Sequence, residues 1–428
     1  MSIRIPAPEQ ILITGAKVYD PVSGKSWSGD VGVRKGILCD AQEIDQAAAE
    51  VIDGKGCVVT HGFIDIHAHF REPGGEDKET LATGARAALA GGFVKVCIMP
   101  NTEPPIDSPE KIRFIMEKAG DLPIDLAVIA AVTWGQKGTE LAELLEMHAA
   151  GAIAFSDDGV PIENGQILKL ALRYTAPIGV PIINHAEDVH LRGDGVMNEG
   201  ALSTRLGLPG NPTQAEAAMV HRDLLIAEDV QGRLHVPHIS TRLAVEQVRQ
   251  FKAKGLSITA EAAPHHIGLT EDAISNYDTN AKVAPPLRSD ADRQAVLAGL
   301  LDGTIDCIAT DHAPHTIESK EMDILHAPCG MIGLESAYGV SNRALMDAGA
   351  KFEQVIDLLT TGPAAVMGFE LKELKIGTPA QLVLVDPKQE WTFSRADVYS
   401  RSRNTPFIGQ QLKGKVKATI TPQGYFRQ

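Results

Sequence analysis

Residues 62–74 read GFIDIHAHFREPG. It begins as an apolar strand and then places His67, His69 and Arg71 on alternate positions. Side chains two apart in a strand point to one face, roughly 7 Å from each other, so we expect these three to share a site. Two imidazoles on one face can converge on a metal ion. Because an isolated His-x-His is more often a pair of ordinary histidines, the rest of the chain must decide.

Seven further apolar runs follow, separated by amphipathic patterns typical of helices. We predict strands at 62–69, 93–100, 125–133, 151–156, 180–186, 233–240, 256–263 and 305–311. Helices are predicted at 77–91, 138–149, 163–176, 213–231, 241–254 and 290–303. Apolar strands joined by helices indicate parallel strands buried on both faces. Eight of them predict an α/β fold of the (β/α)8 TIM-barrel type.

The two ends of the chain differ from this central pattern. Both contain short alternating runs with turn residues and lack a long helix. Short β segments are unstable alone, so we predict one small β-sandwich built by both termini, with two separate additions as the alternative. The expected boundaries are 1–57 and 372–428 for the sandwich, and 58–371 for a catalytic barrel.

Composition excludes several classes of partner. The formal charge of -15 argues against binding to nucleic acid or to an anionic membrane surface. No apolar run approaches the roughly 18 residues of a membrane helix, and the N-terminus does not resemble a secretory signal. Five scattered cysteines without CxxC spacing suggest free thiols in a reducing compartment, so we expect a cytoplasmic protein. An anionic substrate would need a local cation, and Arg71 is the candidate.

Metal-competent side chains follow six of the predicted strands, at the end where barrels keep their active sites. The candidates are His67, His69, Asp158 with Asp157 as its runner-up, His185, His238 and Asp311. Nitrogen and oxygen donors without thiolates suit Zn²⁺, with Mn²⁺ or Co²⁺ as alternatives. Four histidines and two carboxylates exceed one tetrahedral site, which favours two ions. We expect structural roles for His265 and His266, and none at the site for His235.

Several motifs together resemble the dihydroorotase family, in its long bacterial class, within the amidohydrolase superfamily. They are HxHxREPG at 67–74, MPNT at 99–102, FSDDG at 155–159, NHAED at 184–188, TDHAPH at 310–315 and GMIGLESA at 330–337. The likeness extends over nearly the whole chain, including ILITGAKVYDPVSG at 11–24 and LKIGTPAQLVLVDP at 374–387. It implies a barrel with a small β-sandwich. It also implies a zinc-dependent cyclic amidohydrolase that interconverts N-carbamoyl-L-aspartate and L-dihydroorotate in pyrimidine biosynthesis.

The resemblance also implies a role for each matching position. His67 and His69 correspond to ligands of a first ion, Asp158 to a bridging carboxylate, and His185 and His238 to ligands of a second ion. Asp311 corresponds to a ligand that also acts as the general acid and base beside a metal-activated bridging hydroxide. The positions that correspond to substrate contacts are Arg71, Asn101, His315, Cys329 and Gly330.

Other interpretations remain open from the sequence. Hydantoinases, dihydropyrimidinases and allantoinases are related cyclic amidases, but they usually bridge the metals with a lysine that the fourth strand lacks. A non-catalytic scaffold for aspartate transcarbamoylase would typically have lost metal ligands, and none is lost here. A homodimer or an active complex with that enzyme is compatible with the sequence. Ala284 stands where the family usually has asparagine, and Asn280 is a candidate to compensate.

Overall fold

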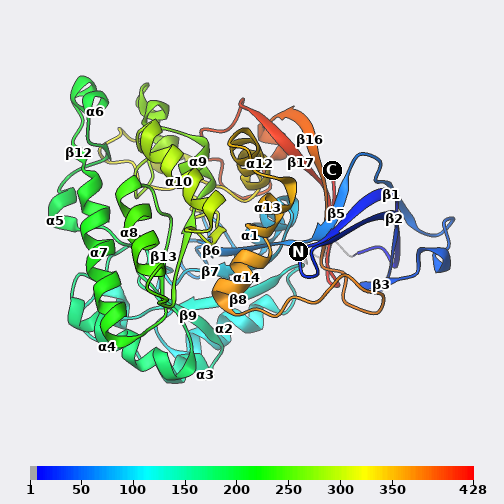
Figure 1. Cartoon of the computed structure of the whole chain (residues 1–428), viewed down its shortest axis with the longest axis horizontal. Coiled ribbons are helices and arrows are strands. Elements are labelled where there is room, and N and C mark those ends of the chain that lie inside the picture. The colour runs from blue at the N-terminus through cyan, green and yellow to red at the C-terminus, as the bar shows by residue number, and fades with distance from the viewer. Residues whose placement is uncertain (1–6) are drawn as a thin grey trace.

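The computed structural model describes residues 7–428. Figure 1 shows a large body of strands and helices, with a β-rich region at one side where blue N-terminal and red C-terminal strands meet. The central part of the chain builds the body, and the two ends build the β-rich region.

Eight parallel strands form the centre of the body, as predicted. Each pairs with the next along the chain, so strand order follows sequence order. The strands are β6 (Phe63–Ala68), β7 (Phe93–Ile98), β8 (Asp125–Ala130), β9 (Ala152–Ser156), β10 (Ile182–Ile183), β13 (Leu234–Val236), β14 (Ile258–Ala262) and β15 (Cys307–Ile308). Strands β6 and β15 share no ladder, but an isolated parallel bridge joins Ala68 to His312 just beyond β15.

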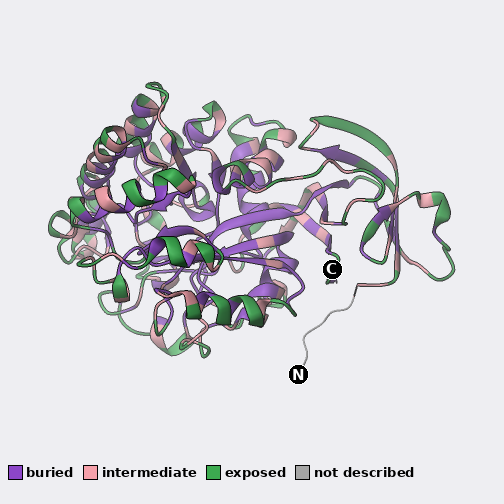
Figure 2. Cartoon of the chain, turned by 90° about the horizontal axis from the view of Figure 1, so that it is seen from below, coloured by how far each residue is buried: buried purple, intermediate pink, exposed green. Residues whose placement is uncertain are grey.

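Helices connect the strands and cover the sheet. They include α1 (Leu81–Ala90), α2 (Pro109–Ala119), α3 (Leu144–Ala149), α4 (Gly165–Thr175), α7 (Thr213–Val230), α8 (Arg242–Lys252) and α10 (Asp290–Asp302). After β15 come α11 (Ile317–Lys320), α12 (Ala337–Asp347), α13 (Phe352–Asp357) and α14 (Thr361–Met367). Figure 2 shows the strands buried while many helices expose one face. This is the pattern expected of amphipathic helices around a buried sheet.

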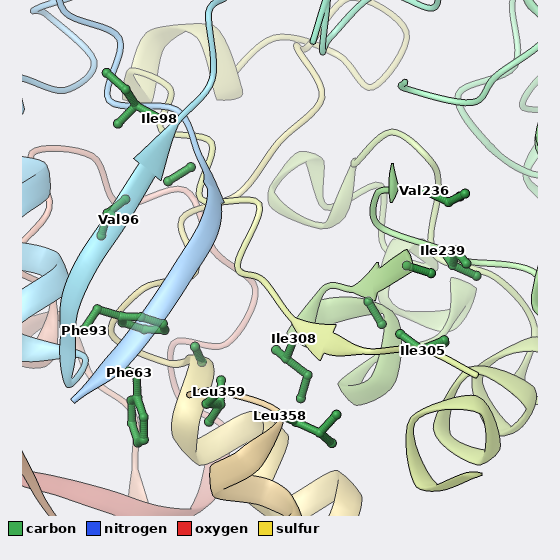
Figure 3. Close-up of a cluster of buried hydrophobic side chains, with 14 of the residues drawn as sticks. Phe63, Phe93, Val96, Ile98, Val236, Ile239, Ile305, Ile308, Leu358 and Leu359 are labelled. Carbon is green, nitrogen blue, oxygen red and sulfur yellow. The ribbon is translucent and has the colours of Figure 1, made fainter. Parts of the chain in front are cut away.

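Alternate residues of the strands enter different buried clusters. Val96 and Ile98 of β7 pack with apolar helix residues in the largest cluster, whereas Cys97 between them packs in a separate one. Figure 3 shows part of the largest cluster, with Phe63 beside Phe93. Their rings meet edge to face at 5.7 Å. The side-chain period of two therefore gives β7 one face toward the helices and one face in a separate cluster.

Strands from both termini share a second sheet. Its members are β1 (Gln10–Asp20), β2 (Lys25–Arg34), β3 (Ile37–Cys39), β4 (Glu50–Asp53), β5 (Val58–His61), β16 (Leu382–Thr392), β17 (Gln411–Ile420) and β18 (Tyr425–Arg427). The two ends meet where β16 pairs antiparallel with β5. Hydrogen bonds unite these strands in one sheet.

Several elements differ from their predicted extents. The fifth and eighth strands are only two residues long, and α3 covers only the last part of the helix predicted at 138–149. Residues 189–211 form a small addition that the hydrophobic pattern did not indicate. It contains α5 (Val189–Arg192), β11 (Met197–Asn198), α6 (Ala201–Leu206) and β12 (Gly210–Asn211). Another short helix, α9 (Pro264–Gly268), follows β14. Elements of this length carry too few residues for a detectable period.

Within residues 7–428, no helix has the length and apolar character needed to cross a bilayer.

Candidate metal centre and substrate pocket

A buried aspartate lies between two pairs of histidines. Asp158 Oδ2 is 3.5 Å from the Nε2 atoms of both His67 and His69. Asp158 Oδ1 is 3.6 Å from His185 Nδ1 and 3.4 Å from His238 Nε2. Each carboxylate oxygen therefore faces its own pair of imidazoles, an arrangement that suits a carboxylate bridging two cations.

Asp311 lies beside the first pair of histidines. Its Oδ1 is 3.1 Å from His69 Nε2 and 3.7 Å from His67 Nε2. Asp311 follows β15, and the two histidines belong to β6 and its C-terminal end. The parallel arrangement brings these strand ends together although the residues are more than 240 positions apart.

Three residues at this site have a left-handed backbone conformation, which is uncommon for residues other than glycine. They are Arg71 with φ 56°, His238 with φ 34° and Asp311 with φ 47°. Such conformations cost of order 1–3 kcal/mol each and persist only where the surrounding structure enforces them. Here they turn the side chains that follow three different strands toward one place.

The donor set fits divalent cations. In the described part of the chain, His67 Nε2 and Asp158 Oδ1 are buried without a hydrogen-bond partner. Buried polar atoms normally have a partner, so these two atoms suit contact with a bound cation. Two groups have donor atoms within 4.8 Å of one another: His67 with Asp158 and His238, and His67 with His69 and Asp311. Imidazoles and carboxylates without a thiolate suit zinc and its neighbours in the first transition row.

Carboxylates of the cluster favour protonation of its histidines. Burial alone would raise the pKa of Asp158, but charged His67 and contacts from His185 and His238 hold it well below its usual range. Burial opposes charging of His185, yet Asp158 and Glu187 raise its pKa to about 10. Burial likewise opposes charging of His67, while Asp158 and Glu261 raise its pKa well above the usual value. A cation would displace these protons, so its affinity should rise with pH.

A pocket of ≈ 200 Å³ opens in front of the cluster. Every site residue predicted from the sequence lines this pocket except His67, which is fully buried. The lining residues are His69, Arg71, Asn101, Asp158, Gly159, His185, His238, Ala284, Asp311, Ala313, His315, Cys329 and Gly330.

Arg71 supplies a cation to this pocket. The one hydrogen bond of its guanidinium in the described structure runs from Nε to Pro314 O, at 3.4 Å. Burial lowers the pKa of Arg71 to about 10, so the guanidinium remains charged at neutral pH. A guanidinium with free N–H groups is suited to a bidentate contact with a carboxylate.

Two other predicted substrate contacts make bonds within the protein. Asn101 Oδ1 is 2.8 Å from His69 Nδ1, so Asn101 orients a proposed metal ligand as well as lining the pocket. His315 Nε2 is 2.8 Å from Cys329 O, whereas its Nδ1 has no partner among the described residues. Burial, with Arg71 nearby, lowers the pKa of His315 to about 3, so this ring is neutral at pH 7. Its Nδ1 is thus available to a ligand.

The loop at Cys329 and Gly330 forms one wall. Gly330 has φ 127°, and a Cβ atom there would lie 2.7 Å from Ala313 Cβ, so a side chain cannot be accommodated. Two buried lysines hold the loop by its carbonyls. Lys320 Nζ donates to Pro328 O at 2.8 Å and Gly330 O at 3.0 Å, and Lys282 Nζ donates to Ala327 O at 2.7 Å. The backbone of this wall is therefore well fixed.

Asp157 and Asp158, the neighbouring candidates after the fourth strand, have different partners. Asp157 accepts hydrogen bonds from Val132 N at 2.8 Å and Thr133 N at 3.1 Å, which uses its carboxylate to join two strand ends. Asp158 alone faces the histidines.

Ala284 lines the pocket, as expected for a position near substrate, but Asn280 bonds to Asp278 and does not line it. The compensation considered for Asn280 is therefore wrong.

The two histidines after β14 differ in their surroundings. His266 Nε2 is 3.0 Å from Pro285 O, a structural contact as expected. His265 Nε2 has no hydrogen-bond partner in the described residues and lies 4.0 Å from Asp311 Oδ2. His265 is thus closer to the cluster than its sequence position suggested.

Comparison with known proteins decides the family. A family model described as Dihydro-orotase-like matches residues 56–244. The dihydroorotase of Pelotomaculum thermopropionicum is 46% identical over 413 residues, which cover 96% of this chain and 97% of the relative. The dihydroorotase of Syntrophotalea carbinolica is 45% identical over the same shares of both chains. The chain belongs to the dihydroorotase family.

Solved structures of cyclic amidases share the dihydroorotase fold described above. The L-hydantoinase of Arthrobacter aurescens superposes with a TM-score of 0.83 at 22% identity, covering 97% of this chain and 95% of its own. The dihydropyrimidinase of Brevibacillus agri gives a TM-score of 0.81 at 20% identity, covering 97% and 94%. These likenesses extend over both the parallel sheet and the terminal sheet.

Sequence reasoning missed the groups behind the cluster. His67 Nδ1 is 2.6 Å from Glu261 Oε1, and His235 Nε2 is 3.1 Å from Glu261 Oε2. His235 therefore lies one contact behind His67, a position that the sequence did not indicate. The sequence signal that could have revealed Glu261 is its position as an acid within the apolar run ITAEA at Ile258–Ala262. A charge in a buried strand requires a partner.

Proposed function

We propose that this chain catalyses the reversible cyclisation of N-carbamoyl-L-aspartate to L-dihydroorotate and water. The observation that carries the proposal is the position of Asp158, with one oxygen toward each histidine pair, in a pocket that also holds Arg71. A metal-competent cluster beside a guanidinium suits a ring amide that bears a free carboxylate. The names of the relatives support the same activity.

We assign the cluster to two ions, with zinc as the preferred metal. His67, His69 and Asp311 would hold the first, His185 and His238 the second, and Asp158 both. When bound, such ions lower the pKa of a water molecule and polarise a carbonyl oxygen. Each of these side chains must be deprotonated at its ligand atom.

Asp311 is proposed as the general acid and base. In hydrolysis it accepts the proton of the attacking water as the new C–O bond forms, and it returns that proton to the ring nitrogen as the C–N bond breaks. Cyclisation runs through the same steps in reverse. Neighbouring histidines outweigh the effect of burial and hold the pKa of Asp311 well below its usual range, so the carboxylate starts ionised.

Arg71 is proposed to bind the substrate carboxylate, with Asn101 and His315 beside it. A bidentate guanidinium contact fixes the substrate in one orientation, and such positioning can contribute several kcal/mol to the lowering of the barrier. The backbone of Cys329 and Gly330 would meet the ring of the substrate. The lysine contacts to this loop keep its carbonyls in place.

The finer architecture is also part of the proposal. We infer that the eight parallel strands close into a barrel, because His69 N donates to His312 O at 2.8 Å between the first and last strand ends. We likewise infer that the terminal sheet folds over its own apolar cluster, which includes Ile11, Val33 and Leu384, as a small sandwich.

The test compares substrates on the zinc-loaded, full-length protein. Dihydroorotate, hydantoin and allantoin are offered separately, and we expect turnover of dihydroorotate alone. The variant Asp311→Ala should lose turnover but retain its fold and most of its zinc, since the other ligands remain. Absence of dihydroorotate turnover in both directions with zinc bound would refute the proposal, and full activity of Asp311→Ala would refute the role of Asp311.

A further inference from the structure

A chain of buried polar groups extends from His67 into the interior. His67 Nδ1 lies 2.6 Å from Glu261 Oε1, and both residues are almost fully buried. The second oxygen, Glu261 Oε2, is 3.1 Å from His235 Nε2. His235 Nδ1 is in turn 2.9 Å from the hydroxyl of Thr259. Four side chains from three strands thus form one connected network.

Strand geometry explains why these groups meet. Leu234 and Val236 of β13 pack in the largest apolar cluster, so His235 between them points to the other face. Ala260 and Ala262 of β14 pack in the same cluster, which turns Glu261 the other way. The network therefore occupies the face of the sheet that looks across to His67.

The hydrogen-bond partners in the network indicate which nitrogen atoms carry hydrogen. Each oxygen of Glu261 contacts one imidazole nitrogen, Oε1 that of His67 Nδ1 and Oε2 that of His235 Nε2. An ionised carboxylate only accepts hydrogen bonds, so His67 Nδ1 and His235 Nε2 must both donate. His235 Nδ1 then accepts from the Thr259 hydroxyl. Every nitrogen in the network except His67 Nε2 has a partner.

The remaining nitrogen is the one that faces the cluster. His67 Nε2 lies 3.5 Å from Asp158 Oδ2 and 3.7 Å from Asp311 Oδ1, and it is buried without a hydrogen bond in the described structure. A hydrogen on Nδ1 leaves the Nε2 lone pair available to a cation. A hydrogen on Nε2 instead would block that position.

We propose that Glu261, held by His235, is a positioning residue that fixes the tautomer and the ring orientation of His67 for binding of the first ion. The inference rests on the proposed metal centre. His69 provides an internal comparison, because its Nδ1 faces a neutral amide oxygen of Asn101 at 2.8 Å. Only His67 of this pair is backed by a carboxylate, whose negative charge makes the opposite nitrogen a better donor to the metal.

The test measures Zn²⁺ affinity of the full-length protein by competition with a chromophoric chelator. The variant Glu261→Gln should bind one of its ions 10–100-fold more weakly, the range typical for loss of such a partner. Glu335→Gln is the matched control, because Glu335 is a buried carboxylate that accepts from Tyr399 N and Ser400 N at 2.8 Å and does not line the pocket. Its Zn²⁺ affinity should equal that of the wild type.

A second measurement distinguishes positioning from a general loss of stability. The visible absorption spectrum of bound Co²⁺ reports the ligand field. It should change in Glu261→Gln but not in Glu335→Gln, even when the melting temperatures of the two metal-free variants are similar. His235→Leu should weaken Zn²⁺ binding less, and adding it to Glu261→Gln should change little, because His235 acts through Glu261.

The outcomes separate this inference from the proposed function. If the wild type binds no Zn²⁺, the metal centre itself is wrong. If the wild type binds Zn²⁺ and Glu261→Gln binds it within twofold as tightly, with an unchanged Co²⁺ spectrum, the positioning role is wrong. If Glu261→Gln does not fold, His235→Leu decides, and an unaltered Zn²⁺ affinity in that variant overturns the inference.

Discussion

Replacement of Arg71 by methionine should weaken substrate binding far more than it affects the fold. Methionine retains much of the apolar stem but removes the guanidinium, whose one bond in the described protein is the 3.4 Å contact of Nε with Pro314 O. Little is therefore lost within the protein. The proposed substrate carboxylate, by contrast, loses two charge-assisted hydrogen bonds, each of which contributes about 1.5–3 kcal/mol.

Water partly replaces those bonds, so we expect a net loss of about 3 kcal/mol of binding free energy. This loss corresponds to a roughly 100-fold fall in kcat/KM. Steady-state hydrolysis of dihydroorotate would show this mainly as a higher KM. The kcat/KM of Arg71→Lys should lie between those of the wild type and Arg71→Met, because lysine keeps the charge but loses the planar fork. Arg113→Met on the exposed face of α2 is the control and should match the wild type. A kcat/KM of Arg71→Met within threefold of the wild-type value would contradict the proposed contact of Arg71 with the substrate carboxylate.

Three further outcomes are expected. Removal of metal by a chelator should abolish turnover, and added Zn²⁺ should restore it. Asp158→Asn should reduce bound zinc by atomic absorption, whereas Asp157→Asn should keep the zinc and lower the melting temperature, since its contacts with Val132 and Thr133 are structural. Burial lowers the pKa of Lys320 from 10.5 to about 8. The folded chain therefore binds this proton less tightly than the unfolded chain, and stability should rise by about 3 kcal/mol from pH 8 to 10.5. Urea denaturation should show this gain in the wild type, and Lys320→Met should lack it.

Local patterns allowed a large part of the site to be predicted. The alternation of His67, His69 and Arg71 after an apolar strand is a local property, and it survives in the folded protein because strand geometry is nearly constant. His185, His238 and Asp311 were found by the same rule, as polar residues that follow apolar strands. The eight parallel strands follow from an equally local alternation of apolar runs and amphipathic helices.

Groups that depend on contact between distant strands could not be found in this way. Glu261 and His235 interrupt their strands as isolated polar residues, and only the packing of β13 and β14 against β6 reveals His67 as their partner. The resemblance favoured Asp158 over Asp157, and the structure adds that the neighbouring strand end engages Asp157 while Asp158 faces the histidines.

Periodicity and motifs were enough to indicate the kind of fold, the family, and the positions that carry imidazole, carboxylate and guanidinium groups. The folded chain was needed to learn which oxygen of Asp158 faces which histidine pair, and which buried groups stand behind His67. The reason is physical: hydrogen-bond partners are set by distances of about 3 Å between segments that lie far apart in the sequence, and no local pattern encodes those distances.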